Sequence, residues 1–361
     1  MHATETLTEA DRLMTVCNSC RYCEGLCAVF PAMETRRLFA DGDINYLANL
    51  CHGCGACYFD CQFAPPHEFN VNVPRIFARV RSDSYRAYAW PPALSPLFVH
   101  NALAIAIISL LSAMGFVLEL IASHDPFAVH RGAGAFYLIL SHRWMVLVFG
   151  TAFSYALLAI VMSVRLFWKD MGEPLRTPKT QRAIWQAVKD ASHLRYLDGG
   201  GGGCMNEDEQ PTDRRKYFHH LTFYGFLLCF VSTALASLYH FLLGREAPYP
   251  WFSLPVIAGT FGGLGLVIGP AGLLIAKLRG DPAVRDESRK GMDFAFIVML
   301  LLTSLTGLGL LLARETAWMG PLLSAHLSIV LALFVTMPYG KFVHGIYRFV
   351  ALVRYARDEP P

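Results

Sequence analysis

Two short stretches decide the fold of the N-terminal part: CNSCRYCEGLC at residues 17–27 and CHGCGACYFDC at residues 51–61. Both stretches place four cysteines in the spacing C-x2-C-x2-C-x3-C, and together they hold eight of the ten cysteines of the chain. The spacing is typical of bacterial proteins in which three thiolates of one stretch and the last cysteine of the other bind a four-iron cluster. The pattern therefore predicts a head built around two iron–sulfur sites.

Pairing the two stretches in this way gives two sets of four ligands. We expect one [4Fe–4S] cluster on Cys17, Cys20, Cys23 and Cys61, and a second on Cys51, Cys54, Cys57 and Cys27. Structural zinc is the alternative, but zinc sites use four ligands that commonly come as two separated pairs. Two runs of four cysteines with identical spacing favour iron–sulfur clusters.

The first residues carry no secretory signal, because acidic side chains stand where a basic region and a short apolar run would be needed. We therefore expect the head to stay in the cytoplasm, where clustered cysteines bind metal instead of forming disulfides. Apolar residues recur at roughly helical spacing in 7–16 and 31–50. The head, which we place at residues 1–92, resembles the α-helical ferredoxins of succinate dehydrogenase iron–sulfur subunits and heterodisulfide reductase-type proteins.

The remainder of the chain is apolar. Over all 361 residues 54% are hydrophobic, 16% are charged and the mean hydropathy is +0.37, which excludes a wholly soluble enzyme. The formal net charge of +3 is too small to indicate a nucleic-acid partner. Six segments without Asp, Glu, Lys or Arg are long enough to cross a lipid bilayer: 87–118, 144–164, 217–244, 247–276, 294–313 and 316–340.

The basic residues between these segments predict their orientation. The connections 165–216 and 277–293 hold ten and five Lys and Arg residues, whereas the connections on the opposite side hold one or two each. Basic connections stay in the cytoplasm. We therefore expect a multi-pass protein of the bacterial inner (cytoplasmic) membrane, with both termini in the cytoplasm.

The predicted fold is mainly α: an N-terminal α-helical two-cluster ferredoxin domain followed by a six-helix transmembrane bundle. Transmembrane helices 1 and 2 fall within 93–172, and helices 3 to 6, a haem-binding part like cytochrome b, fall within 217–361. Between them, 173–216 forms a cytoplasmic connector. Its five consecutive glycines at 199–203 predict a flexible loop.

Histidines stand near both ends of two membrane segments. The third segment has His219 and His220 at its cytoplasmic start and His240 near its outer end, and the sixth has His326 near its outer start. His344 follows the sixth segment on the cytoplasmic side, 18 residues or about five helical turns from His326, so both should share one face.

The matched histidines predict bis-histidine ligation of b-type haem. His219 with His344 would hold an inner haem, and His240 with His326 an outer one, since neutral imidazole suits iron. His219 is preferred to His220 because it lies closer in helical phase to His240. One haem instead of two, or histidines that only form hydrogen bonds, are the alternatives. His142, with Arg143 and Trp144, could line a quinone pocket or form an interfacial polar cluster.

Two segments carry a family resemblance. RRKYFHHLTFYGF at 214–226 resembles the haem-bearing helix of nitrate reductase γ-like cytochromes, and MPYGKFVH at 337–344 resembles the ending of their haem-ligating helix. The head, six spans, glycine-rich loop and double histidine together resemble the tricarballylate (citrate) utilisation protein B family. That resemblance implies electron transfer from a cytoplasmic FAD-dependent partner, tricarballylate dehydrogenase, to quinone in the lipid bilayer.

The chain itself has no Gly-x-Gly-x-x-Gly at a strand-to-helix turn, so we do not expect it to bind flavin. The prediction is an electron-transfer subunit of a flavoprotein:quinone oxidoreductase system. A tricarboxylate transporter, an electron-transfer module for a flavoprotein of cobalamin biosynthesis, and a redox sensor or assembly factor are the alternatives.

Overall fold

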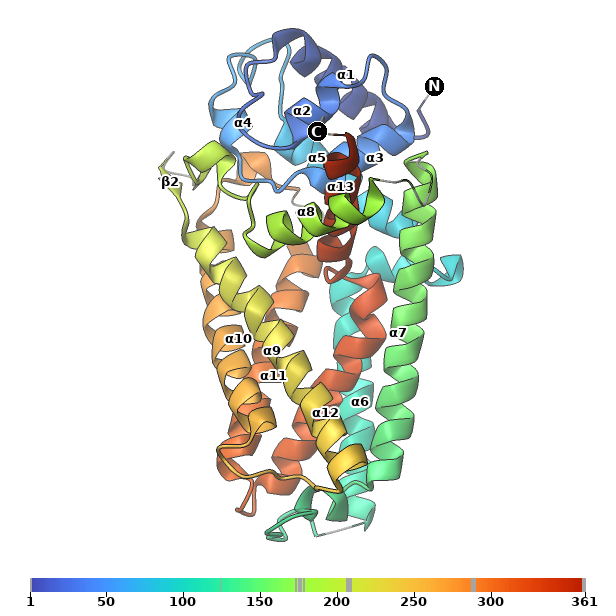
Figure 1. The fold of residues 1–361 in the computed structure, drawn as a ribbon, viewed down its shortest axis with the longest axis vertical. Helices are drawn as coiled ribbons and strands as arrows, with labels where there is room; N and C mark the ends of the chain where they lie inside the picture. The colour runs from blue at the N-terminus through green and yellow to red at the C-terminus, as the bar shows by residue number, and fades with distance from the viewer. Residues whose placement is uncertain are drawn as a thin grey trace.

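The chain folds into a helical head on top of a long bundle of helices, as Figure 1 shows. The computed structural model describes residues 2–123, 125–172, 174, 177, 179–205, 210–286 and 290–358. Both ends of the chain lie at the head end of the molecule. An even number of membrane crossings between the two ends is consistent with this placement.

The head consists of helices α1 (Glu5–Cys20), α2 (Val29–Glu34), α3 (Asp41–Leu50), α4 (Ala56–Phe59) and α5 (Val73–Ala87). Capping explains where the two long helices begin: the side chain of Thr4 accepts a hydrogen bond from the amide of Leu7, and Asn72 accepts one from Arg75. Their apolar faces meet in a core with Leu13, Met14, Ile44, Leu47 and Phe77, which are almost completely buried. The α-helical head predicted from the sequence is thus confirmed.

Six helices are long and apolar enough to cross a membrane, as the sequence predicts. They are α6 (Asn101–Ser123), α7 (His142–Asp170), α9 (Arg214–Leu243), α10 (Leu254–Arg279), α11 (Lys290–Ala313) and α12 (Met319–Thr336). The first begins later than its apolar segment because the proline-rich residues before it form the short helix η1 (Pro92–Phe98). Short helices η2 (Ala135–Leu138) and η4 (Pro282–Val284) lie in connections between the spans.

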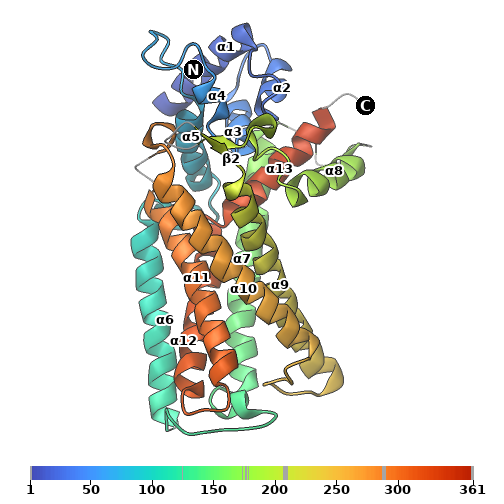
Figure 2. The same cartoon turned by 90° about the vertical axis from the view of Figure 1, so that its left-hand side faces the viewer.

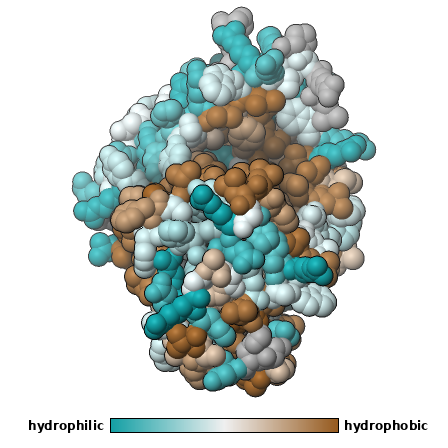
Figure 3. All heavy atoms as spheres, turned by 60° about the horizontal axis from the view of Figure 1, so that its bottom comes forward, coloured by the Kyte–Doolittle hydropathy of each residue, from teal (hydrophilic) through white to brown (hydrophobic). Residues whose placement is uncertain are grey.

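The outer surfaces of these helices suit a membrane. Large apolar side chains are exposed along α6, α7 and α9, among them Leu110, Leu157 and Leu238. Exposed apolar surface of this extent is unfavourable in water and favourable against lipid. Figure 3 shows the end of the molecule away from the head, where hydrophilic residues gather with hydrophobic ones around them.

Helices α9 and α10 lie unusually close together, side by side in Figure 2. A Cβ atom added at Gly225 would come 2.9 Å from the carbonyl oxygen of Gly262, and one at Gly269 would come 2.6 Å from the amide nitrogen of Thr222. Small residues therefore let the two backbones touch, as in other membrane helix pairs.

The sixth span ends before His344, which corrects the prediction of one continuous helix from His326 to His344. Helix α12 stops at Thr336, the short helix η6 (Met337–Tyr339) follows, and a separate helix α13 (Val343–Asp358) continues from the bundle into the head, where it contacts α3 and α8. Pro338 cannot donate a backbone hydrogen bond and Gly340 is extended, with φ −140°. The expectation that His326 and His344 share one helix face is therefore wrong, because no continuous helix joins them.

The connector is packed against the head and is not a free loop, contrary to the expectation for five glycines. It contains α8 (Thr180–Ser192), η3 (Gly199–Gly201) and a two-stranded hairpin of β1 (Cys204–Met205) and β2 (Pro211–Thr212). Gly199 has φ +57°, and a Cβ atom there would come 2.9 Å from the Cβ of Ala56. Residues 173, 175, 176, 178 and 206–209 of the connector lie outside the described residues.

Candidate cofactor sites

The first set of cysteines surrounds a cavity between the end of α1 and the residues that follow α4. The cavity has a volume of about 240 Å³. Its lining includes four thiols of the first predicted set and one of the second: Cys17, Cys20, Cys23, Cys61 and Cys57. The exposed side chains of Arg21 and Tyr22 form part of its rim, and Tyr22 is 72% exposed.

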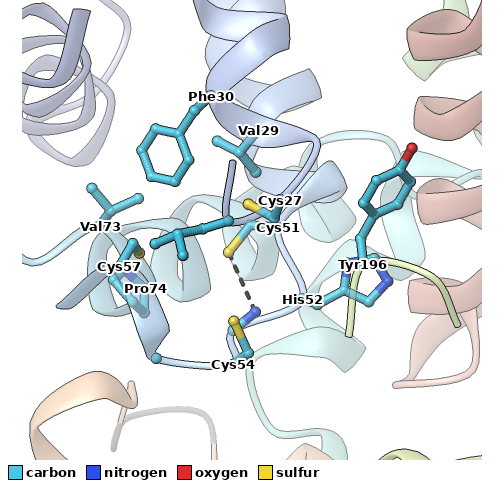
Figure 4. Close-up of a pocket in the computed structure, with 13 residues that line it drawn as sticks. Cys27, Val29, Phe30, Cys51, His52, Cys54, Cys57, Val73, Pro74 and Tyr196 are labelled. Carbon is cyan, nitrogen blue, oxygen red and sulfur yellow. Dashed lines mark hydrogen bonds between the residues drawn. The ribbon is translucent and has the colours of Figure 1, made fainter. Parts of the chain in front are cut away.

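The second set surrounds a narrower cavity deeper in the head, shown in Figure 4. All four thiols of the second predicted set line it: Cys27, Cys51, Cys54 and Cys57. His52 and Tyr196 lie beside it. The structure thus brings each predicted set together, including the cysteine that comes from the other stretch.

The thiols within a set influence one another's ionisation. Burial raises the pKa of Cys17 to about 12, and nearby Cys23, Cys61 and Cys20 add to the effect. Burial likewise raises the pKa of Cys27, with Cys51 and Cys54 adding to it. Without a cation these thiols therefore keep their protons, and loading with iron must release them.

Each donor set consists of four thiols, the ligands that iron–sulfur clusters use. Within the described residues, no group of three or more His, Cys, Asp or Glu side chains is placed to hold a metal ion as it stands. The first cavity has room for a larger group. The second has a volume of only about 20 Å³, close to the space that one water molecule needs, so its thiols must spread when a cluster enters. The ligand assignment stays a prediction that this geometry supports.

The inner pair of histidines lies directly below the head. His219 on α9 and His344 on α13 have ring centres 6.1 Å apart, with ring planes at 70°. Metal–imidazole bonds are about 2 Å long, so two imidazoles on opposite sides of one iron have centres about 6 Å apart. This centre-to-centre distance is therefore compatible with His219 and His344 together holding one haem iron, which would supply a one-electron centre.

The proton positions of this pair also suit ligation. Nδ1 of His344 lies against the carbonyl of Lys341, so it carries the proton and leaves Nε2 free for a metal. Burial, Lys341 and Arg348 hold the pKa of His344 well below its usual value, so the ring is neutral. Nδ1 of His219 is buried and has no hydrogen-bond partner among the described residues.

His220 faces a different neighbour. Its Nε2 lies 3.2 Å from the carbonyl oxygen of Ser192 on α8, and its ring stacks on Tyr224. This contact directs His220 away from His344, and it supports the sequence-based preference for His219.

The predicted outer pair is not assembled in the same way. The ring of His240 stacks on His142 with centres 3.6 Å apart, which is too close for an iron between them. His326 lies against α11, where its Nδ1 is 3.1 Å from the carbonyl oxygen of Thr303. The ring contacts of the described residues include none between His240 and His326. His142, which was expected to line a quinone pocket or to form an interfacial polar cluster, thus stacks on His240.

Three arginines and a histidine next to the second cysteine set were missed by the sequence analysis. His52 is 8% exposed, and its Nδ1 lies 3.1 Å from the carbonyl oxygen of Leu50. The arginines donate hydrogen bonds to carbonyls of residues 48–53; they are Arg81, Arg215 and Arg348. Arg215 lies four residues before His219, and Arg348 lies four residues after His344. This spacing is visible in the sequence and could have drawn attention to both arginines.

A partly buried ion cluster lies at the same level of the bundle. The carboxylate of Asp293 on α11 pairs with Lys277 on α10, and it lies 2.8 Å from Nζ of Lys341. Lys341 is also the residue whose carbonyl contacts His344. The sequence did not single out this cluster.

A helical head with clustered thiols above six helices long and apolar enough to span a membrane defines the class: a membrane protein with a ferredoxin-like head. A family model described as "Citrate utilization protein B Fer4-like domain" matches residues 10–87, and one described as "Citrate utilization protein B" matches residues 96–360. The chain is 48% identical to a protein of Escherichia coli named "Citrate utilization protein B", over 99% of this chain and 93% of that protein.

The chain therefore belongs to the citrate utilization protein B family. The family name and the Fer4-like head indicate an electron-transfer role in citrate utilisation and binding of iron–sulfur clusters. No solved structure matches the chain.

Proposed function

We propose that this protein transfers electrons from a cytoplasmic FAD-dependent dehydrogenase to quinone in the bacterial cytoplasmic membrane. Two [4Fe–4S] clusters on the two cysteine sets and one b-type haem between His219 and His344 would supply centres that each take up and release one electron. A reduced flavin carries two electrons and quinone takes up two electrons and two protons, so single-electron centres connect the two reactions.

The 6.1 Å spacing of the rings of His219 and His344, directly below the second cysteine set, is the observation that carries this proposal. The chain's own residues perform three tasks there. The cysteines would hold the iron of the clusters in the head, and the two histidines would hold the haem iron at the head end of the bundle. The ion cluster around Asp293 joins α10 and α11 to the segment before α13.

The orientation follows from the charges and the shared position of the chain ends. The basic connections 165–216 and 277–293 lie on the head side of the bundle. By the positive-inside rule we place the head and both termini in the cytoplasm. A cytoplasmic dehydrogenase can therefore reach the head, and lipid-soluble quinone can reach the helices.

The test uses full-length protein purified anaerobically in detergent. We expect about eight cluster irons and one haem per chain, from the ligand sets above. We also expect a reduced b-type spectrum that is reoxidised when a short-chain quinone is added. A chain without iron and haem would overturn the proposal, as would a reduced spectrum that quinone leaves unchanged. Citrate uptake into vesicles by haem-free protein would support the transporter instead.

A further inference from the structure

We propose that the two cysteine sets have an order: electrons enter at the set that contains Cys17 and leave toward the membrane from the set that contains Cys51. This inference rests on the proposed function. It adds that Arg215 and Arg348 are positioning residues, which attach the second set to the two helices that carry His219 and His344.

The first observation is the set of hydrogen bonds at the start of the second cysteine stretch. Arg215 of α9 donates to the carbonyl oxygens of Gly53 at 2.7 Å and His52 at 3.0 Å. Arg348 of α13 donates to the carbonyl oxygen of Cys51 at 2.9 Å. One short loop is thereby bonded to both helices.

The second observation is the position of these arginines along their helices. Arg215 precedes His219 by four residues on α9, and Arg348 follows His344 by four residues on α13. Residues four apart lie on the same face of a helix, about one turn from each other. His219 and His344 are thus each about one helical turn from an arginine that bonds the backbone of residues 51–53.

The third observation is the difference in accessibility between the two sets. The glycine loop covers the second set: a Cβ at Gly199 would come 3.7 Å from the sulfur of Cys54, and the amide of Met205 donates to the carbonyl of Cys54 at 2.9 Å. The first set lines the larger cavity, with exposed Arg21 and Tyr22 beside it, and all four of its cysteines are partly exposed, whereas Cys51 of the second set is buried. Electron exchange falls steeply with distance, so a docked protein should exchange electrons faster with the first set.

The arginines also set the electrostatics of the second set. Each adds a positive charge beside it, and a nearby positive charge favours the reduced, more negative form of a bound cluster. Replacing either arginine with a neutral residue should therefore make that cluster harder to reduce. The first cluster should be less sensitive, because the arginines bond residues 51–53, next to two cysteines of the second set, and within the described part of the chain they make no hydrogen bond to the residues around Cys17, Cys20, Cys23 or Cys61.

The experiment is a redox titration of the full-length protein, with clusters followed by electron paramagnetic resonance and haem by visible absorbance. Cys20→Ser and Cys54→Ser identify the signals of the first and second clusters. We expect Arg215→Gln and Arg348→Gln each to lower the reduction equilibrium constant of the Cys54-dependent signal three- to tenfold, tenfold being about 59 mV for one electron. The matched control, Arg21→Gln, should instead shift the Cys20-dependent signal.

Arg215→Lys separates charge from structure, because it keeps the charge and should restore the midpoint even where Arg215→Gln assembles poorly. The proposed order is overturned if the two Gln variants shift the Cys20-dependent signal as far as the Cys54-dependent one, or if they leave the Cys54-dependent midpoint at its wild-type value. An Arg215→Lys midpoint shifted as far as that of Arg215→Gln would overturn the role of the charge. Wild-type protein without clusters or haem would refute the proposed function itself, so the two failures are distinguishable.

Discussion

Asp293 and Lys341 form an ion pair of 2.8 Å that joins α11 to the segment leading into α13. The backbone carbonyl of the same lysine contacts Nδ1 of His344. One carboxylate on a membrane helix therefore helps to position a haem-ligand candidate on the following element. Lys277 contributes a second cation to this carboxylate from α10.

We expect Asp293→Asn to destabilise the protein. The change leaves two lysines without their shared counter-charge in a partly buried site, which costs on the order of 3 kcal/mol. Thermal unfolding in detergent should show the loss, together with weaker haem retention. Glu9→Gln, which removes an exposed pair with Arg12, is the control and should change stability by less than about 1 kcal/mol. Equal stability of the two variants would contradict this reading of the cluster.

The two neighbouring histidines of α9 should behave differently. His219→Ala is expected to remove b-type haem, because it deletes one of the two rings that face each other. His220→Ala should retain haem, since His220 contacts Ser192 on α8. Pyridine haemochrome analysis of the two purified variants measures the difference, and haem loss only in His220→Ala would reverse the assignment.

The stacked histidines at the outer end predict the haem count. Because His240 lies on His142 and makes no ring contact with His326 among the described residues, we expect one haem per chain. His240→Ala should therefore leave the haem content unchanged. A wild-type ratio of two that falls to one in this variant would establish the outer site.

Single cysteine changes should separate the two clusters. Cys20→Ser and Cys54→Ser are each expected to remove about four of the eight cluster irons, since they belong to different sets. Cys229→Ser lies in α9, away from the head, and should leave iron unchanged. Iron and sulfide analysis of anaerobic preparations measures these contents. Retention of all eight irons in Cys54→Ser would contradict the second set.

The N-terminus provides a pH-dependent contact outside the cofactor sites. His2 bonds the carboxylate of Asp41, which raises the pKa of His2 above its usual value of about 6.5. The stabilisation is fully present below that value and is lost as pH rises through the raised pKa. We expect a loss of a few tenths to about 1 kcal/mol, measured as a fall in melting temperature between pH 6 and 8.5. His2→Ala should lack this fall.

The sequence predicted the parts of the fold that depend on local pattern. The spacing of the cysteines and the length of the apolar segments led to a helical head and six spans, and both are present. The residues from Met337 to Gly340 were misread because apolar character continued through them, although Pro338 and Gly340 could have signalled the break. The apolar composition predicted that this segment crosses the membrane, but it did not predict the residue at which the helix ends.

The contacts between distant segments could not be predicted. Five glycines indicate flexibility by composition, yet their small size is what allows Gly199 to approach Ala56 and Cys54. The stacking of His142 on His240 joins α7 to α9 and has no counterpart in the spacing of either helix. The hydrogen bond from Arg348 to Cys51 likewise depends on the direction of α13, which changes at the helix break after α12.

The covering of Cys54 by the glycine loop has a consequence for biogenesis. The cysteines that line the narrow cavity are all synthesised by residue 57, but the loop that covers them follows the second span, and Arg348 follows the sixth. Maturation enzymes therefore meet the thiols of the narrow cavity before the glycine loop lies over Cys54. The time available for metal delivery before that point is set by the rate at which residues 58–205, which include the first two spans, are translated and inserted.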